Sequence, residues 1–130
     1  MHGQMPQEIE VWYTIPALRR ALAKALLDQE LSQKRIAGVM GITEAAVSQY
    51  LHSKRASEVV FSKKIEVEIK KSAKLIAQDP KKMMQEMMRL TRIEDVKLVT
   101  CKLHKNHDQN LPSNCETCFE GDLVNIQTAK

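Results

Sequence analysis

Residues 33–51 read QKRIAGVMGITEAAVSQYL, a pattern typical of two short helices joined by a tight turn. Ser32 is a suitable N-cap for the first helix, and Gly41 is a suitable end for it, because glycine adopts the left-handed conformation without a Cβ clash. Ala37 is small enough to let two helices cross closely. The stretch therefore predicts a sharp bend at Gly41 and a second helix that starts at Thr43. The residues expected to face the core are Ile36, Met40, Ile42, Val47 and Tyr50.

The second helix leaves four residues on its outward side, and these are small or able to form hydrogen bonds. They are Glu44, Ala45, Ser48 and Gln49. A helix with such a face fits the major groove of DNA, where base edges present donors and acceptors. Glu44 also has an ordinary alternative role, because an acidic residue in the first turn stabilises the helix dipole.

These residues together resemble the helix-turn-helix of the lambda repressor/Cro class, also called the XRE type. The resemblance implies that Gln33 and Thr43 contact phosphates near the helix N-termini and that the four outward residues read base edges. It also implies that Gln49 pairs with adenine, Glu44 with cytosine and Ala45 with a thymine methyl group. Basic residues would add contacts to the DNA backbone without sequence preference, namely Lys34, Lys54 and Arg55.

The likeness covers most of the chain. Residues 11–55 are similar to a family of archaeal transcriptional regulators, in which an XRE-type domain precedes a helical segment and a cysteine-containing tail. The resemblance implies a sequence-specific DNA-binding transcriptional regulator. Such domains act as two-fold dimers on near-palindromic operators, so we expect a homodimer bound to double-stranded DNA. The operator, the target genes and the direction of regulation are left open.

Upstream of the turn, apolar residues at three- and four-residue steps predict an amphipathic helix over residues 17–29. Thr14 is its expected N-cap, and Pro16 is expected near its start. The short apolar run from Ile9 to Tyr13 is partly β-branched, and it predicts an extended arm that packs against the domain.

Downstream, four-residue apolar steps predict a helix from Ser57 to Gln78. The fragment IEVEI within it alternates like a strand, so a strand is a competing interpretation. Asp79-Pro80 ends this helix, and a further helix is expected over residues 81–90. Its methionines suit core packing or a dimer seam, with a ligand pocket or a soft-metal site as the alternative. They are Met83, Met84, Met87 and Met88.

The last thirty residues are polar and contain two ligand pairs. Cys101-x-x-His104 and Cys115-x-x-Cys118 have the spacing of a zinc knuckle, and three thiolates with one imidazole complete a tetrahedral site. The same donors suit an iron–sulfur cluster, and His107 is an alternative ligand to His104. A reversible Cys115–Cys118 disulfide and an ordinary tail are the remaining interpretations. Residues 101–122 look too irregular for a helix. Together with the ligand pairs, this predicts a metal-binding tail that braces the fold or senses redox state.

The sequence as a whole predicts an all-α protein. We expect a lambda-repressor-like helix-turn-helix domain over residues 1–56, a helical dimerisation segment over 57–100 and the tail over 101–130. The net charge of +4 arises from 20 basic and 16 acidic residues, which permits DNA binding without requiring it. Neither a signal peptide nor a run of ~20 apolar residues is present, so a cytoplasmic protein without membrane contact is expected.

The sequence favours a binding protein over an enzyme. It contains no nucleophile–base pair, no phosphate-binding glycine loop and no pair of acids typical of hydrolases. The Cys-x-x-Cys motif lacks the βαβ context of a disulfide oxidoreductase. The alternative to a regulator is a nucleic-acid-binding accessory or antitoxin-like domain that acts through a partner protein.

Overall fold

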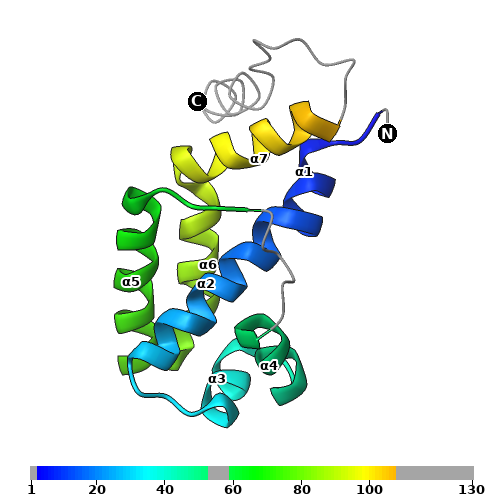
Figure 1. Ribbon diagram of the computed structural model, residues 1–130. Coiled ribbons are helices and arrows are strands. Elements are labelled where there is room, and N and C mark those ends of the chain that lie inside the picture. Colours follow the sequence, from blue (N-terminus) through cyan, green and yellow to red (C-terminus); the bar gives the residue numbers. More distant parts are fainter. Residues whose placement is uncertain (1–2, 53–58, 108–130) are drawn as a thin grey trace.

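The computed structural model describes residues 3–52 and 59–107, and all regular secondary structure within them is helical (Figure 1). The expected all-α class is thus confirmed for this part of the chain. Lys54, Arg55, Cys115 and Cys118 lie outside the described residues. The elements are α1 (Pro6–Ile9), η1 (Glu10–Thr14), α2 (Ile15–Asp28), α3 (Gln33–Met40), α4 (Glu44–His52), α5 (Lys63–Gln78), η2 (Pro80–Lys82), α6 (Met83–Arg92) and α7 (Glu94–His107).

The N-terminal segment is helical, so the predicted extended arm and the Thr14 cap are wrong. α1, η1 and α2 follow one another in helical backbone, and Thr14 is fully buried with helical dihedral angles. η1 is a π-helical turn in which the Ile15 N–H donates to the Glu10 carbonyl oxygen. Pro16 follows directly, and it lacks an N–H and crowds the carbonyl four residues before it. The wider π turn accommodates this proline inside a long helix.

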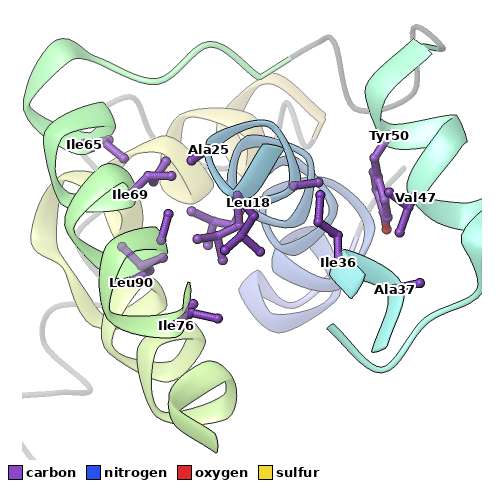
Figure 2. Close-up of a cluster of buried hydrophobic side chains, with 14 of the residues drawn as sticks. Leu18, Ala25, Ile36, Ala37, Val47, Tyr50, Ile65, Ile69, Ile76 and Leu90 are labelled. Carbon is purple, nitrogen blue, oxygen red and sulfur yellow. The ribbon is translucent and has the colours of Figure 1, made fainter. Parts of the chain in front are cut away.

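The core is built around α2, which crosses the middle of the molecule (Figure 1). Leu18, Leu22 and Leu26 of α2 are fully buried and belong to a single cluster of apolar side chains. Figure 2 shows that cluster, with α3 and α4 contributing from one side and α5 and α6 from the other. Residues on both sides of position 56 therefore share one core.

α5 is a helix rather than a strand, although it begins at Lys63 and not at Ser57. The Ser62 hydroxyl caps it by accepting a hydrogen bond from the Ile65 N–H at 3.3 Å. Its buried side follows the predicted four-residue steps, which confirms the helical interpretation of that pattern. The buried residues are Ile65, Ile69, Ser72, Ala73 and Ile76.

α5 and α6 are also joined by a polar network. The buried Glu86 carboxylate accepts hydrogen bonds from the Ser72 hydroxyl at 2.7 Å and from Arg89 Nε at 3.1 Å. Arg89 also donates to Glu68 Oε1 at 3.1 Å and to the Ser72 hydroxyl at 2.8 Å. The buried acid is thus neutralised and hydrogen-bonded, as burial of a charge requires.

α7 extends to His107, so the expectation that residues 101–107 are too irregular for a helix is wrong. This helix packs beside α1 and η1 (Figure 1), and packing against them explains why it continues. A buried hydrogen bond of 2.7 Å joins the Thr14 and Thr100 hydroxyls across the contact. Within the described ranges, no helix has both the length and the apolar character needed to cross a membrane.

Candidate nucleic-acid interface

The bend between α3 and α4 lies where the sequence predicted it. The Ser32 hydroxyl starts α3 by accepting a hydrogen bond from the Arg35 N–H at 3.1 Å. Gly41 ends it with φ 69° and ψ 31°, in the left-handed region. The Ile42 N–H then returns to the Ala37 carbonyl oxygen at 3.1 Å, which closes the turn. These local hydrogen bonds fix how α4 leaves the turn.

α4 has one buried side and one exposed side. The Thr43 hydroxyl caps it by accepting a hydrogen bond from the Ala46 N–H at 3.1 Å. Val47 is fully buried and Tyr50 is 5% exposed, which anchors the helix to the core beside α2 and α3. The residues assigned to base reading lie on the other side of the helix. Glu44, Ala45 and Gln49 are exposed, and Ser48 is half-buried.

The residues expected to contact phosphates are spread over both helices. Thr43 and Lys34 are exposed, and Gln33 is half-buried at the start of α3. Gln33 Nε2 lies 3.5 Å from His52 Nε2, a contact that links the start of α3 to the end of α4. Of the basic residues expected to contact the DNA backbone, Lys34 lies on the surface that the structure describes. Lys54 and Arg55 fall within residues 53–58, which are outside the described ranges.

Two residues that the sequence interpretation left out also lie at this surface. Arg35 is exposed next to Lys34, and both line a shallow hollow between α3 and Pro80 of η2. His52 is exposed at the end of α4 and contacts Gln33. The signal that points to Arg35 is its place one residue after Lys34 in the first turn of α3. Nothing local in the sequence indicates the His52 contact, because it depends on how the helices cross.

The described half of the candidate metal site lies on α7. Cys101 and His104 are three residues apart on one side of the helix, and each is 7% exposed. His104 Nε2 is 2.6 Å from the Gln4 carbonyl oxygen. A carbonyl oxygen only accepts, so Nε2 carries the proton and Nδ1 is the ring nitrogen left for a metal. Among the described residues no group of three or more His, Cys, Asp or Glu side chains is arranged to hold a metal ion.

No family model, curated protein or solved structure matches this chain.

Proposed function

We propose that the protein is a dimeric, sequence-specific DNA-binding transcriptional regulator with a helix-turn-helix of the lambda repressor/Cro type. α3 and α4 form the DNA-binding unit, and α4 enters the major groove. Gln33, Lys34 and Thr43 contact phosphates, and Glu44, Ala45, Ser48 and Gln49 read base edges. Lys54 and Arg55, which follow α4 in the sequence, add contacts to the DNA backbone.

The observation that carries this proposal is the two-sided character of α4. Val47 and Tyr50 attach the helix to the core, while Glu44, Ala45 and Gln49 project from its opposite side. A glutamine in such a position can bind adenine with two hydrogen bonds, and an alanine can touch a thymine methyl group. An exposed face of small and amide side chains on a rigidly held helix is what base reading requires.

Selection from a random double-stranded DNA library, followed by fluorescence anisotropy, tests the proposal. We expect an enriched, near-palindromic sequence. Gln49→Ala should weaken binding to it by about 1–3 kcal/mol and relax preference at one base position, with little change on scrambled DNA. Gln78 is an exposed glutamine at the end of α5, so Gln78→Ala is the matched control. It should change neither the binding affinity nor the base preference. Equal losses on selected and scrambled DNA, or no enriched sequence, would contradict base reading.

A structural or sensory metal site is a second proposal, favoured by the His104–Gln4 hydrogen bond. Metal-binding histidines usually donate their other ring N–H to a carboxylate or a backbone carbonyl, which fixes the ring and its tautomer. His104 makes such a bond at 2.6 Å, and Cys101 lies one turn away on the same side of α7. These two would supply a thiolate and an imidazole Nδ1, and Cys115 and Cys118 would supply two further thiolates to zinc or an iron–sulfur cluster.

Metal analysis after anaerobic purification tests this second proposal. Colourless protein with one zinc ion per chain would identify a zinc site. Brown protein that contains iron and sulfide would identify an iron–sulfur cluster. Cys101→Ser should lower the metal content of either form. Thr91→Ser, a half-buried residue on α6, serves as the control. Protein that is metal-free under these conditions and takes up neither metal would contradict the site.

A further inference from the structure

A shallow hollow lies between α3 and η2, at the end of the molecule where η2 joins α5 to α6 (Figure 1). One side of the hollow comes from the first turns of α3, and Pro80 of η2 forms the other side. The residues on the α3 side are Ser32, Lys34, Arg35, Gly38 and Val39. The fold therefore brings the outer side of α3 next to a segment that is far from it in the sequence.

The surroundings of the hollow are basic. α3 and η2 together contain four basic residues and no acidic one, although the whole chain has 20 basic and 16 acidic residues. Lys34, Arg35 and Lys81 are exposed, and none of them forms a salt bridge within the described ranges. Asp79 precedes η2, and its carboxylate accepts a hydrogen bond from the Lys81 N–H at 3.2 Å. Cations gathered in this way attract a polyanion.

Gly38 lies in the hollow, and nothing within the described chain explains its small size. A Cβ added there would meet no atom within 4 Å, and its φ is not in the left-handed region. It lies inside α3, where alanine is the more favourable residue. Lys34 and Arg35 lie four and three positions before it, on the same side of the helix. A glycine that no neighbour requires suits the close approach of another molecule to the helix backbone.

We propose that this hollow receives a sugar–phosphate strand of double-stranded DNA, beside the bases that α4 reads. Lys34, Arg35 and Lys81 neutralise its phosphates, and Gly38 lets the strand come close to α3. The inference rests on the proposed function, in which Gln33 and Lys34 already contact phosphates. Because Lys34 belongs both to that surface and to the hollow, a strand that passes Lys34 continues into the hollow. This continuity favours DNA over an acidic protein as the occupant.

Contacts of this kind contribute affinity without base preference. Each cation that neutralises a phosphate releases counterions from the duplex, so it steepens the dependence of binding on salt. Base preference comes from the side chains that face the base edges. Variants of the hollow and variants of α4 should therefore differ in two measurable quantities, which are the salt dependence and the preference for one DNA sequence.

Fluorescence anisotropy of the full chain, on selected and on scrambled duplexes over a range of salt concentrations, tests the cations. Arg35→Gln and Lys81→Gln should each weaken binding to both duplexes by about five- to tenfold at ~0.1 M salt. Each should also reduce the slope of log K against log salt concentration by about 0.9. Lys102→Gln is the control, because Lys102 is an exposed cation on α7, at the opposite end of the molecule (Figure 1). It should change neither quantity.

Substitution of Gly38 tests the close approach. Gly38→Ala and Gly38→Leu fill the hollow by increasing amounts, so affinity for both duplexes should fall in that order, about tenfold or more for leucine. Alanine favours the helix, so a loss of DNA binding in Gly38→Ala cannot come from unfolding. Gln85→Leu, on the exposed side of α6, is the control for an added apolar side chain and should leave binding unchanged. Circular dichroism checks that every variant keeps its helices.

The outcomes separate this inference from the proposed function. Gln49-dependent base preference, together with unchanged affinity and salt slope in Arg35→Gln and Lys81→Gln, would overturn the hollow alone and would leave it to an acidic partner other than DNA. Equal losses in Lys102→Gln, or full affinity in Gly38→Leu, would also overturn it. Reduced salt slopes without any base preference would support the hollow and overturn base reading by α4. A chain that binds neither duplex would overturn both.

Discussion

Two glycines in the α3–α4 region have different backbone conformations, so replacing each with alanine should have opposite effects on stability. Gly41 has φ 69°, and Gly38 lies within α3, yet a Cβ added to either would meet no atom within 4 Å. Gly41→Ala should therefore destabilise the fold by about 1–2 kcal/mol through backbone strain alone. Gly38→Ala should stabilise it by about 0.5–1 kcal/mol, because alanine is the better helix former. Urea denaturation of both variants shows whether the free energy of unfolding falls or rises in each. A loss of stability in both variants would contradict this explanation from backbone conformation.

The same residue-level view explains which local features were predictable. Ser32 and Gly41 act through hydrogen bonds that join residues no more than five positions apart. The neighbouring sequence is therefore enough to predict their roles. His104 depends on Gln4, one hundred positions away, and Thr14 depends on Thr100. Contacts at such separations arise only when distant helices pack, and no local pattern contains them.

At the level of elements, the α5–α6 pair depends on Arg89. Its guanidinium is the cation that balances both Glu86 and Glu68, at 3.1 Å from each carboxylate. Arg89→Met should cost about 2–3 kcal/mol, less than a fully buried pair because the Arg89 side chain is 37% exposed. Lys74→Met, an exposed cation on α5, should stay within about 0.5 kcal/mol of wild type. Similar losses in the two variants would show that the network contributes nothing specific.

The difference in stability between wild type and Arg89→Met should depend on pH because of Glu68. The hydrogen bond from Arg89 lowers the pKa of the Glu68 carboxyl below its ordinary value of 4.5. A lowered pKa in the folded state stabilises the protein above pH 4.5, and this contribution is lost as the pH falls through the folded-state value. The stability gap between wild type and Arg89→Met should therefore narrow as the pH drops below that range. Urea titrations at neutral and acidic pH measure it, and a constant gap would contradict this origin.

Elements with a regular apolar period were predicted well, and elements shaped by their neighbours were not. α5 follows its four-residue steps, with Ile65, Ile69 and Ile76 buried. The segment Ile9–Tyr13 is too short to show a period, and its helical state depends on Ile9 and Thr14 being buried beneath other helices. The first residues of the tail are helical for a similar reason, since Cys101 and His104 pack inward.

For the whole molecule, the shared apolar cluster means that the α3–α4 pair, which we propose binds DNA, has no core of its own. Leu18 and Leu22 belong to the same apolar cluster as Val47 of α4 and Ile69 of α5. A small fragment that loses half of such a cluster buries too little apolar surface to offset its conformational entropy. Residues 1–56, expected from the sequence as a domain, should therefore not form a stable fold when expressed without the rest.

Unfolding of the full chain tests this in a way that does not depend on a fragment. Trp12, the single tryptophan, lies in η1 at the N-terminal end, whereas far-UV circular dichroism reports on helices throughout the molecule. If one core holds all of them, the urea transitions followed by Trp12 fluorescence and by circular dichroism should coincide, with the same midpoint and the same slope. Independent units would instead unfold at separate midpoints, because each would have a free energy of unfolding of its own. Two resolved transitions would contradict the shared core and would support a division of the chain near residue 56.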